Sequence, residues 1–282
     1  MLSRVRTGTP RGDVIPSQVF TCAATDINSS YALTTAVCRF DIAKTCFVCD
    51  YFVQKCRVDQ KLNDTAYTRE VYELLTRHVR AVRDIGIKFD AYGIDAGGRQ
   101  FAAVTTFAKQ SPTLCGMSVI PMLGRAGRNW NPNVKTRIRN AINDTVFCRD
   151  TSGNVWLAFN ADTHREQMHR AWTAETGAPG GLSLFDGVVN HTEFAIQVTN
   201  EKLVAKQKTL DGRISYIWKT REPHDLADCV NMCRALASAR NISDTSFISS
   251  APDASMPDLV GASPSARVDE TADGGICIGC DF

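Results

Sequence analysis

The sequence predicts an α/β protein in which a mixed central β-sheet is flanked by α-helices. Three observations support this class. Residues 18–56 contain three β-like runs, residues 66–85 have helical periodicity, and the segments that follow alternate between the two. The order βββαβαβ requires at least one parallel crossover, because a strand–helix–strand unit returns to the same sheet.

The first β region reads as a strand followed by a hairpin. Its runs are QVFTCAATD (18–26), YALTTAVCRF (31–40) and KTCFVCDYFVQKC (44–56), all rich in Val, Phe, Thr, Tyr and Cys. Residues 1–17, which precede them, have the polar, proline-containing composition of a lead-in or linker.

The next segment has the spacing of a helix. Apolar residues recur near helical intervals, with Asp64 or Thr65 as the predicted cap and Gly86 as the stop. Three elements follow: a strand at 88–95, a helix at 97–110 and a strand at 116–123.

The second half predicts a hairpin and three helices. The β runs 144–150 and 154–160 flank the turn sequence Thr-Ser-Gly. Asp162 or Thr163 is the predicted cap of a helix at 164–176. The remaining expected elements are a helix at 191–207, a strand at 212–219 and a last helix at 222–240.

Composition divides the chain into a lead-in (1–17), a folded domain (18–244) and an acidic tail (245–282) that we expect to be disordered. The tail has six acids and one arginine, hence a net charge of −5, which leaves +7 on the remainder of a chain of net charge +2. A basic body suits a polyanionic partner. No apolar run is long enough to span a membrane and no signal peptide is evident, so we expect a cytoplasmic protein.

Eleven cysteines raise the question of metal or disulfides. Most lie in apolar runs and are interpreted as buried, reduced thiols. Cys46 and Cys49 lie in a β-like run, where positions i and i+3 face opposite sides, so they are not expected to share a metal. Cys277 and Cys280 lie in the polar tail, where zinc binding or oxidation stays an open alternative.

Four acids stand at positions where chemistry gathers in α/β sheets. Asp26 and Asp95 each end a predicted strand, and Asp225 and Asp228 open the last helix beside His224. Functional groups collect beyond the carboxyl ends of adjacent strands. Three converging carboxylates repel one another unless cations neutralise them, and Mg²⁺ or Mn²⁺ with oxygen ligands is the natural solution.

Each acid also has a structural explanation. Asp26 before Ile-Asn-Ser-Ser and Asp95 before Gly-Gly suit turns, with Gly97 and Gly98 permitting a sharp one. Asp225 and Asp228 suit the positive end of a helix dipole.

Several segments resemble the nuclease half of the large terminase subunit of tailed phages, in its lambda-type branch. They are VIPSQVFTCAATDINSSYALTTAV, YGIDAGGRQFAAV, GNVWLAFNADTHREQMHRAW, GAPGGLSLF, HTEFAIQVTNEKLVAK and EPHDLADCVNMCRALASA, and they extend from about residue 12 to 240. Their order and spacing carry the resemblance, since no single motif is specific.

The resemblance implies a ribonuclease H-like fold with three acids that bind two Mg²⁺ or Mn²⁺ ions. Asp26, Asp95 and Asp228 match these acids, and Asp225 would be a supporting ligand. His224 would orient water or phosphate, although a helix-capping imidazole is equally compatible with its position.

The implied activity is metal-dependent, two-metal endonucleolytic cleavage of double-stranded DNA concatemers during phage genome packaging, in the host cytoplasm. The implied partners are the portal protein, the small terminase subunit and an ATPase domain, in cis or in trans, because the chain has no GxxxxGK[ST] loop. The alternatives are another ribonuclease H-like nuclease of resolvase or transposase type, and a non-catalytic DNA- or capsid-docking module.

One basic segment is a candidate for DNA binding. Residues 124–140 contain one tryptophan, Trp130, no acid and five cations: Arg125, Arg128, Lys135, Arg137 and Arg139. Such a segment suits sequence-independent phosphate contacts, with a solvated basic loop as the alternative.

Overall fold

The computed structural model of the chain describes residues 4–15, 17–28, 32–56, 59, 61–126, 129–138, 142–187, 191–208 and 214–241. The acidic tail and its two cysteines lie outside these residues. In the described part no helix is long and apolar enough to cross a membrane.

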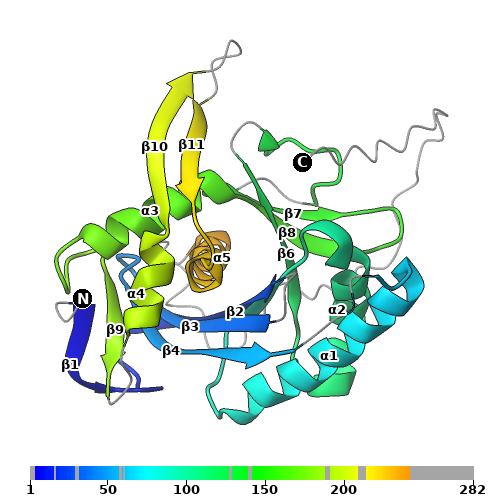
Figure 1. Cartoon of the computed structure of the whole chain (residues 1–282), viewed down its shortest axis with the longest axis horizontal. Coiled ribbons are helices and arrows are strands. Elements are labelled where there is room, and N and C mark those ends of the chain that lie inside the picture. Colours follow the sequence, from blue (N-terminus) through cyan, green and yellow to red (C-terminus); the bar gives the residue numbers. More distant parts are fainter. Residues whose placement is uncertain are drawn as a thin grey trace.

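A mixed β-sheet forms the centre of the fold. Its strands are β1 Val5–Pro10, β2 Gln18–Asn28, β3 Ala32–Asp41, β4 Cys46–Lys55, β5 Ala91–Asp95, β6 Ile120–Arg125, β7 Thr145–Arg149, β8 Val155–Asn160 and β9 Leu182–Asp186. Across the sheet they follow the order β1-β9-β4-β3-β2-β5-β6-β8-β7 (Figure 1). The strands β2, β3 and β4 are antiparallel, whereas β2, β5, β6 and β8 are parallel. The expected mixed central sheet is confirmed.

Helices cover both faces of the sheet. They are α1 Asp64–Asp84, α2 Phe101–Cys115, α3 Ala161–Thr173, α4 Thr192–Thr199 and α5 Asp225–Arg240, with a short 3-10 helix, η2 Gly98–Gln100, before α2. One apolar core lies between the sheet and α1 with α2, and the other lies on the opposite face against α3, α4 and α5 (Figure 1). A sheet covered on both faces needs apolar side chains at successive positions, which explains the continuous apolar runs.

The last helix, α5, is enclosed on all sides. Every residue from Cys229 to Ala239 is buried, because the helix packs against β2, β3, α3 and α4. A helix in this position needs small or apolar residues around its whole circumference, and alanine and cysteine supply them.

The cysteines act as small core residues, as the sequence predicts. Cys46 lies in the α5-side core and Cys49 in the α1-side core, so the two thiols face opposite sides of β4. Burial raises the pKa of Cys38, Cys46, Cys229 and Cys233 well above the ordinary thiol value, and these thiols are therefore unreactive at neutral pH.

Two predicted helix caps are wrong by one to three residues. The N-cap of α1 is Asn63, whose side chain accepts a hydrogen bond from the Ala66 amide, in place of Asp64 or Thr65. The N-cap of α3 is Asn160, in place of Asp162 or Thr163. In both cases an asparagine just before the helix has the extended backbone that a cap requires.

The structure also corrects three segments. Residues Val5–Pro10, within the expected lead-in, form β1, which pairs in parallel with β9. Neither of these two strands was predicted. The helix expected at 191–207 ends at Thr199, and Glu201–Lys208 forms β10, antiparallel to β11 Ile214–Thr220. Pairing with β11 satisfies the backbone of this segment and overrides its helical pattern.

Candidate active site

Asp26 and Asp95 lie side by side just beyond the last paired residues of the adjacent parallel strands β2 and β5. The parallel register of β2 and β5 ends with Thr25 opposite Ile94, so the next residue on each strand is an aspartate. Because side chains alternate along a strand, both aspartates share the face of Cys22 and Ala24, which is the face covered by α5.

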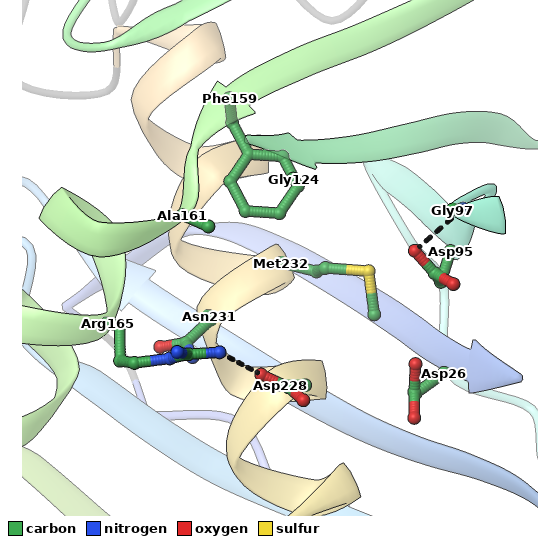
Figure 2. A pocket seen from close by; sticks show the side chains of 10 residues that line it. All are labelled: Asp26, Asp95, Gly97, Gly124, Phe159, Ala161, Arg165, Asp228, Asn231 and Met232. Carbon is green, nitrogen blue, oxygen red and sulfur yellow. Dashed lines mark hydrogen bonds and ion pairs between the residues drawn. The ribbon is translucent and has the colours of Figure 1, made fainter. Parts of the chain in front are cut away.

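The first turn of α5 brings a third carboxylate to this place. Asp26, Asp95 and Asp228 line one pocket of about 290 Å³, together with Gly97, Gly124, Phe159, Ala161, Arg165, Asn231 and Met232. Figure 2 shows Asp228 on α5 and the two strand aspartates on the other side of the pocket. Residues that are far apart in the chain thus converge, as their positions in the sequence led us to expect.

The strand aspartates resist ionisation. Burial, and then the charges of Asp95, Asp228 and Asp225, raise the pKa of Asp26 well above its ordinary value. Burial raises the pKa of Asp95 to about 6, although hydrogen bonds from the Gly97 amide (3.1 Å) and Gln100 Nε2 (2.9 Å) oppose the shift. Both acids therefore hold their protons more tightly than a solvent-exposed carboxyl group does.

Gly97 fits closely against the Asp95 carboxylate. A Cβ at this position would lie 3.3 Å from Asp95 Oδ1, and the Gly97 amide donates to the same oxygen. Gly98 has φ +62°, which glycine adopts without strain. The predicted sharp turn after Asp95 is present and directs backbone donors at the acid.

Asp228 has the opposite electrostatics. Burial alone would raise its pKa, but His224 Nδ1 at 2.8 Å from Oδ2 and Arg165 Nη2 at 3.3 Å from Oδ1 lower it below the ordinary value. The bond to Asp228 in turn raises the pKa of His224, against the effect of burial. His224 makes no side-chain cap bond to α5, so in the structure its partner is the carboxylate.

Asp225 lies outside the lining of this pocket. It sits one turn before Asp228 and accepts a hydrogen bond from Asn28 Nδ2 at 2.8 Å, which ties the start of α5 to the end of β2.

The sequence did not single out Glu201 or Arg165. The Glu201 side chain is fully buried, with Arg165 Nε at 3.2 Å, His169 Nε2 at 3.6 Å and His224 Nδ1 at 4.0 Å. Arg165 thus bridges Glu201 and Asp228. Glu201, His224 and Asp228 also offer ligand atoms within 4.8 Å of one another. Nothing in the local sequence signals Glu201, because its segment has helical periodicity.

The basic segment is only partly described. Arg125 follows the pocket residue Gly124 and is exposed, as are Lys135 and Arg137, whereas Arg128 and Arg139 lie outside the described residues. The segment runs along β7, where Arg137 forms an isolated backbone β-bridge with Cys148. Trp130 is half-buried against the cluster that contains Val146, so its ring is not presented as a free stacking surface.

One protein family matches the chain. The model described as "Terminase large subunit gpA, endonuclease domain" covers residues 2–247. No curated protein matches the chain significantly.

Among solved structures, the chain is similar to the nuclease domain of the large terminase subunit gp2 of bacterial virus Sf6. A mutant of that domain with manganese and β-thujaplicinol is 10% identical, with 77% of this chain and 89% of that chain covered and a TM-score of 0.44. A second structure of the domain is 12% identical, with the same coverage and a TM-score of 0.40. A Ppx/GppA family member from Aquifex aeolicus is 11% identical, with 53% and 54% covered and a TM-score of 0.27.

Proposed function

Since the chain belongs to the family of terminase large subunit gpA endonuclease domains, we propose that it cleaves double-stranded DNA concatemers with the help of divalent metal ions. The biological role of the chain in this proposal is that of a nuclease in phage DNA packaging. The observation that carries the metal-dependent activity is the convergence of Asp26, Asp95 and Asp228 on one pocket.

The residues present fit divalent cations. Carboxylate oxygens are the ligands that Mg²⁺ and Mn²⁺ prefer, and burial together with the charges of neighbouring acids raises the pKa values of Asp26 and Asp95. Asp26, Asp95 and Asp228 would hold two such ions, with Asp225 in support. When bound, the ions supply Lewis-acid activation of water and neutralise charge on the phosphate.

The protein's own groups orient the site. His224 and Arg165 fix the Asp228 carboxylate from two sides, and buried Glu201 holds Arg165 in turn. Gly97 and Gln100 fix Asp95. Arg165 is also the cation that lines the described pocket, and its guanidinium would be available to a phosphate oxygen when Asp228 holds a metal ion.

DNA contacts would come from the exposed cations next to the pocket. Arg125 follows Gly124 at the carboxyl end of β6 and is the described member of the basic segment adjacent to the site. Lys135 and Arg137 would extend the contact along β7, and Arg128 and Arg139 are proposed on sequence grounds alone. Such contacts bind phosphates without reading base sequence.

One site of this kind cuts one strand, so a double-strand break requires two subunits or a repositioning of the DNA. The ATPase domain, the portal protein and the small terminase subunit are the proposed partners, and the host cytoplasm is the proposed location.

Plasmid cleavage tests the proposal. The wild-type chain is incubated with supercoiled DNA in EDTA, Mg²⁺ or Mn²⁺, beside Asp95→Asn and the control Asp84→Asn, an exposed aspartate on α1. We expect metal-dependent nicking by the wild type and the control, and none by Asp95→Asn. Equal cutting by all three proteins would remove Asp95 from the chemistry, and inactivity of the wild type in every metal would favour the docking module.

A further inference from the structure

Arg234 is a buried arginine without a carboxylate partner in the described parts of the chain. Its exposure is 7%, and its Nε and Nη1 atoms have no hydrogen-bond partner among the residues that the structure describes. Arginine is rarely buried unless it is paired, because an uncompensated charge in the interior is strongly destabilising. The protein nevertheless places Arg234 on α5, one of its most enclosed elements.

None of the described groups around Arg234 neutralises its charge. The thiols that face the guanidinium are Cys38 and Cys46, and burial keeps both protonated and uncharged. Lys44 adds a second positive charge, and Arg234 and Lys44 both repel a proton on the buried ring of His164. The only acid in the neighbouring turn, Asp41, accepts a hydrogen bond from the Thr45 amide.

These cations border a small cavity. Arg234 and Lys44 line it with Phe40, Gln167, Ala237 and Ser238, and its volume is about 10 Å³. That volume is of the order of one water-sized group. Gln167 and Ser238 provide polar atoms beside the two cations. The cavity shares no lining residue with the carboxylate pocket.

From this arrangement we propose that Arg234 and Lys44 form an anion site that takes a single carboxylate group. Arginine pairs preferentially with carboxylates, and a cavity of about one water-sized group admits a single carboxylate oxygen. The carboxylate comes either from the acids of residues 245–282, which follow α5 in this chain, or from another protein. The site is independent of the proposed nuclease activity.

Thermal unfolding of the full chain tests the site with formate as the probe. Wild type, Arg234→Met and Arg69→Met, an exposed arginine on α1, are compared in EDTA with sodium formate or sodium chloride at equal ionic strength. We expect formate to raise the melting temperature of the wild type and of Arg69→Met by roughly 3 °C at ten times its dissociation constant. Arg234→Met should show no such rise, and in chloride it should be at least as stable as wild type because the buried guanidinium is removed.

A second full-length variant identifies the source of the carboxylate. It carries amides at the six tail acids, which are Asp253, Asp258, Asp269, Glu270, Asp273 and Asp281. If these acids fill the site, the wild type will not respond to formate, whereas the amide variant will be less stable in chloride and will respond. A response in the wild type itself would mean that the site is open to a partner's carboxylate.

Two results would overturn the proposal. One is a formate response that is the same in Arg234→Met as in its parent, whether wild type or amide variant. The other is a response to chloride equal to that to formate, which would exclude a carboxylate site. Should Arg234→Met fail to fold, Lys44→Met at the half-buried rim provides the same comparison, with a reduced formate response expected.

Discussion

Asp26 and Asp95 are the first residues beyond the paired positions of two adjacent parallel strands, and their side chains share one face of the sheet. The charge of Asp95 is the largest electrostatic contribution that raises the pKa of Asp26 after burial itself. The register of β2 and β5 therefore builds a repulsion into the folded protein. A cation relieves this repulsion, and several measurable properties depend on it.

Replacing Asp95 with asparagine should stabilise the metal-free protein at neutral pH. Because the folded pKa is raised to about 6 from an ordinary value of 3.8, the folded state holds this proton more tightly than the unfolded chain does. The stability that the proton contributes is complete below pH ~4 and is lost as the pH rises through about 6. We expect Asp95→Asn to raise the free energy of unfolding by about 1–2 kcal/mol at pH 7.5 in EDTA and to change it little at pH 4.

Urea titrations at the two pH values measure this difference. Asp84→Asn, at an exposed position on α1, controls for the loss of a charge in general. A variant that is less stable than wild type at pH 7.5 would show that the Asp95 carboxylate is already compensated.

Divalent ions should stabilise the wild type and bind Asp26→Asn poorly. A ligand that binds only the folded state at ten times its dissociation constant adds about 1.4 kcal/mol. Asp26→Asn removes one acid and much of the repulsion, so it should be more stable than wild type in EDTA yet gain less from Mg²⁺ or Mn²⁺. Melting temperatures with and without EDTA, supported by titration calorimetry, provide the comparison, and an undiminished gain in Asp26→Asn would place the ions elsewhere.

Arg165 and Glu201 should be strongly coupled. Arg165→Met leaves the fully buried Glu201 and the nearby Asp228 without their cation, and loss of one partner of a buried pair costs about 3–5 kcal/mol. Adding Glu201→Gln removes the stranded charge, so the double variant should recover about 1–3 kcal/mol relative to the sum of the single effects. Urea midpoints of the wild type, Arg165→Met, Glu201→Gln and the double variant give this coupling energy. Additive losses would mean that Glu201 is compensated by His169 or His224 instead.

Arg125 should contribute one phosphate contact to DNA binding. Arg125→Ala is expected to weaken binding equally across sequences and to reduce the salt dependence of log K by about one. Fluorescence anisotropy in EDTA avoids cleavage during the measurement. Arg69→Ala on α1 is the matched control, and an unchanged salt slope in Arg125→Ala would separate this residue from the DNA path.

The elements that carry the three acids could be predicted because their local signals agree with their tertiary role. β2 and β5 are apolar on both faces, and α5 begins with acids after a proline, so propensity and packing point the same way. Glu201 could not be found in this way. Its burial depends on the chain turning at Asn200 and on pairing with β11, which are tertiary effects that the helical pattern of residues 191–207 conceals. β1 and β9 were missed for a related reason, since each is a short strand defined mainly by its neighbours.

The enclosed position of α5 also bears on how the molecule assembles. The helix is the last described element of the chain, yet it fills the centre of one core, against strands formed almost two hundred residues earlier. Contacts so distant in sequence carry a large loop-closure cost and slow folding. A chain that has not yet inserted α5 carries two of the three acids on a sheet whose apolar face is uncovered. The three acids therefore converge only in a chain in which α5 has docked against the sheet.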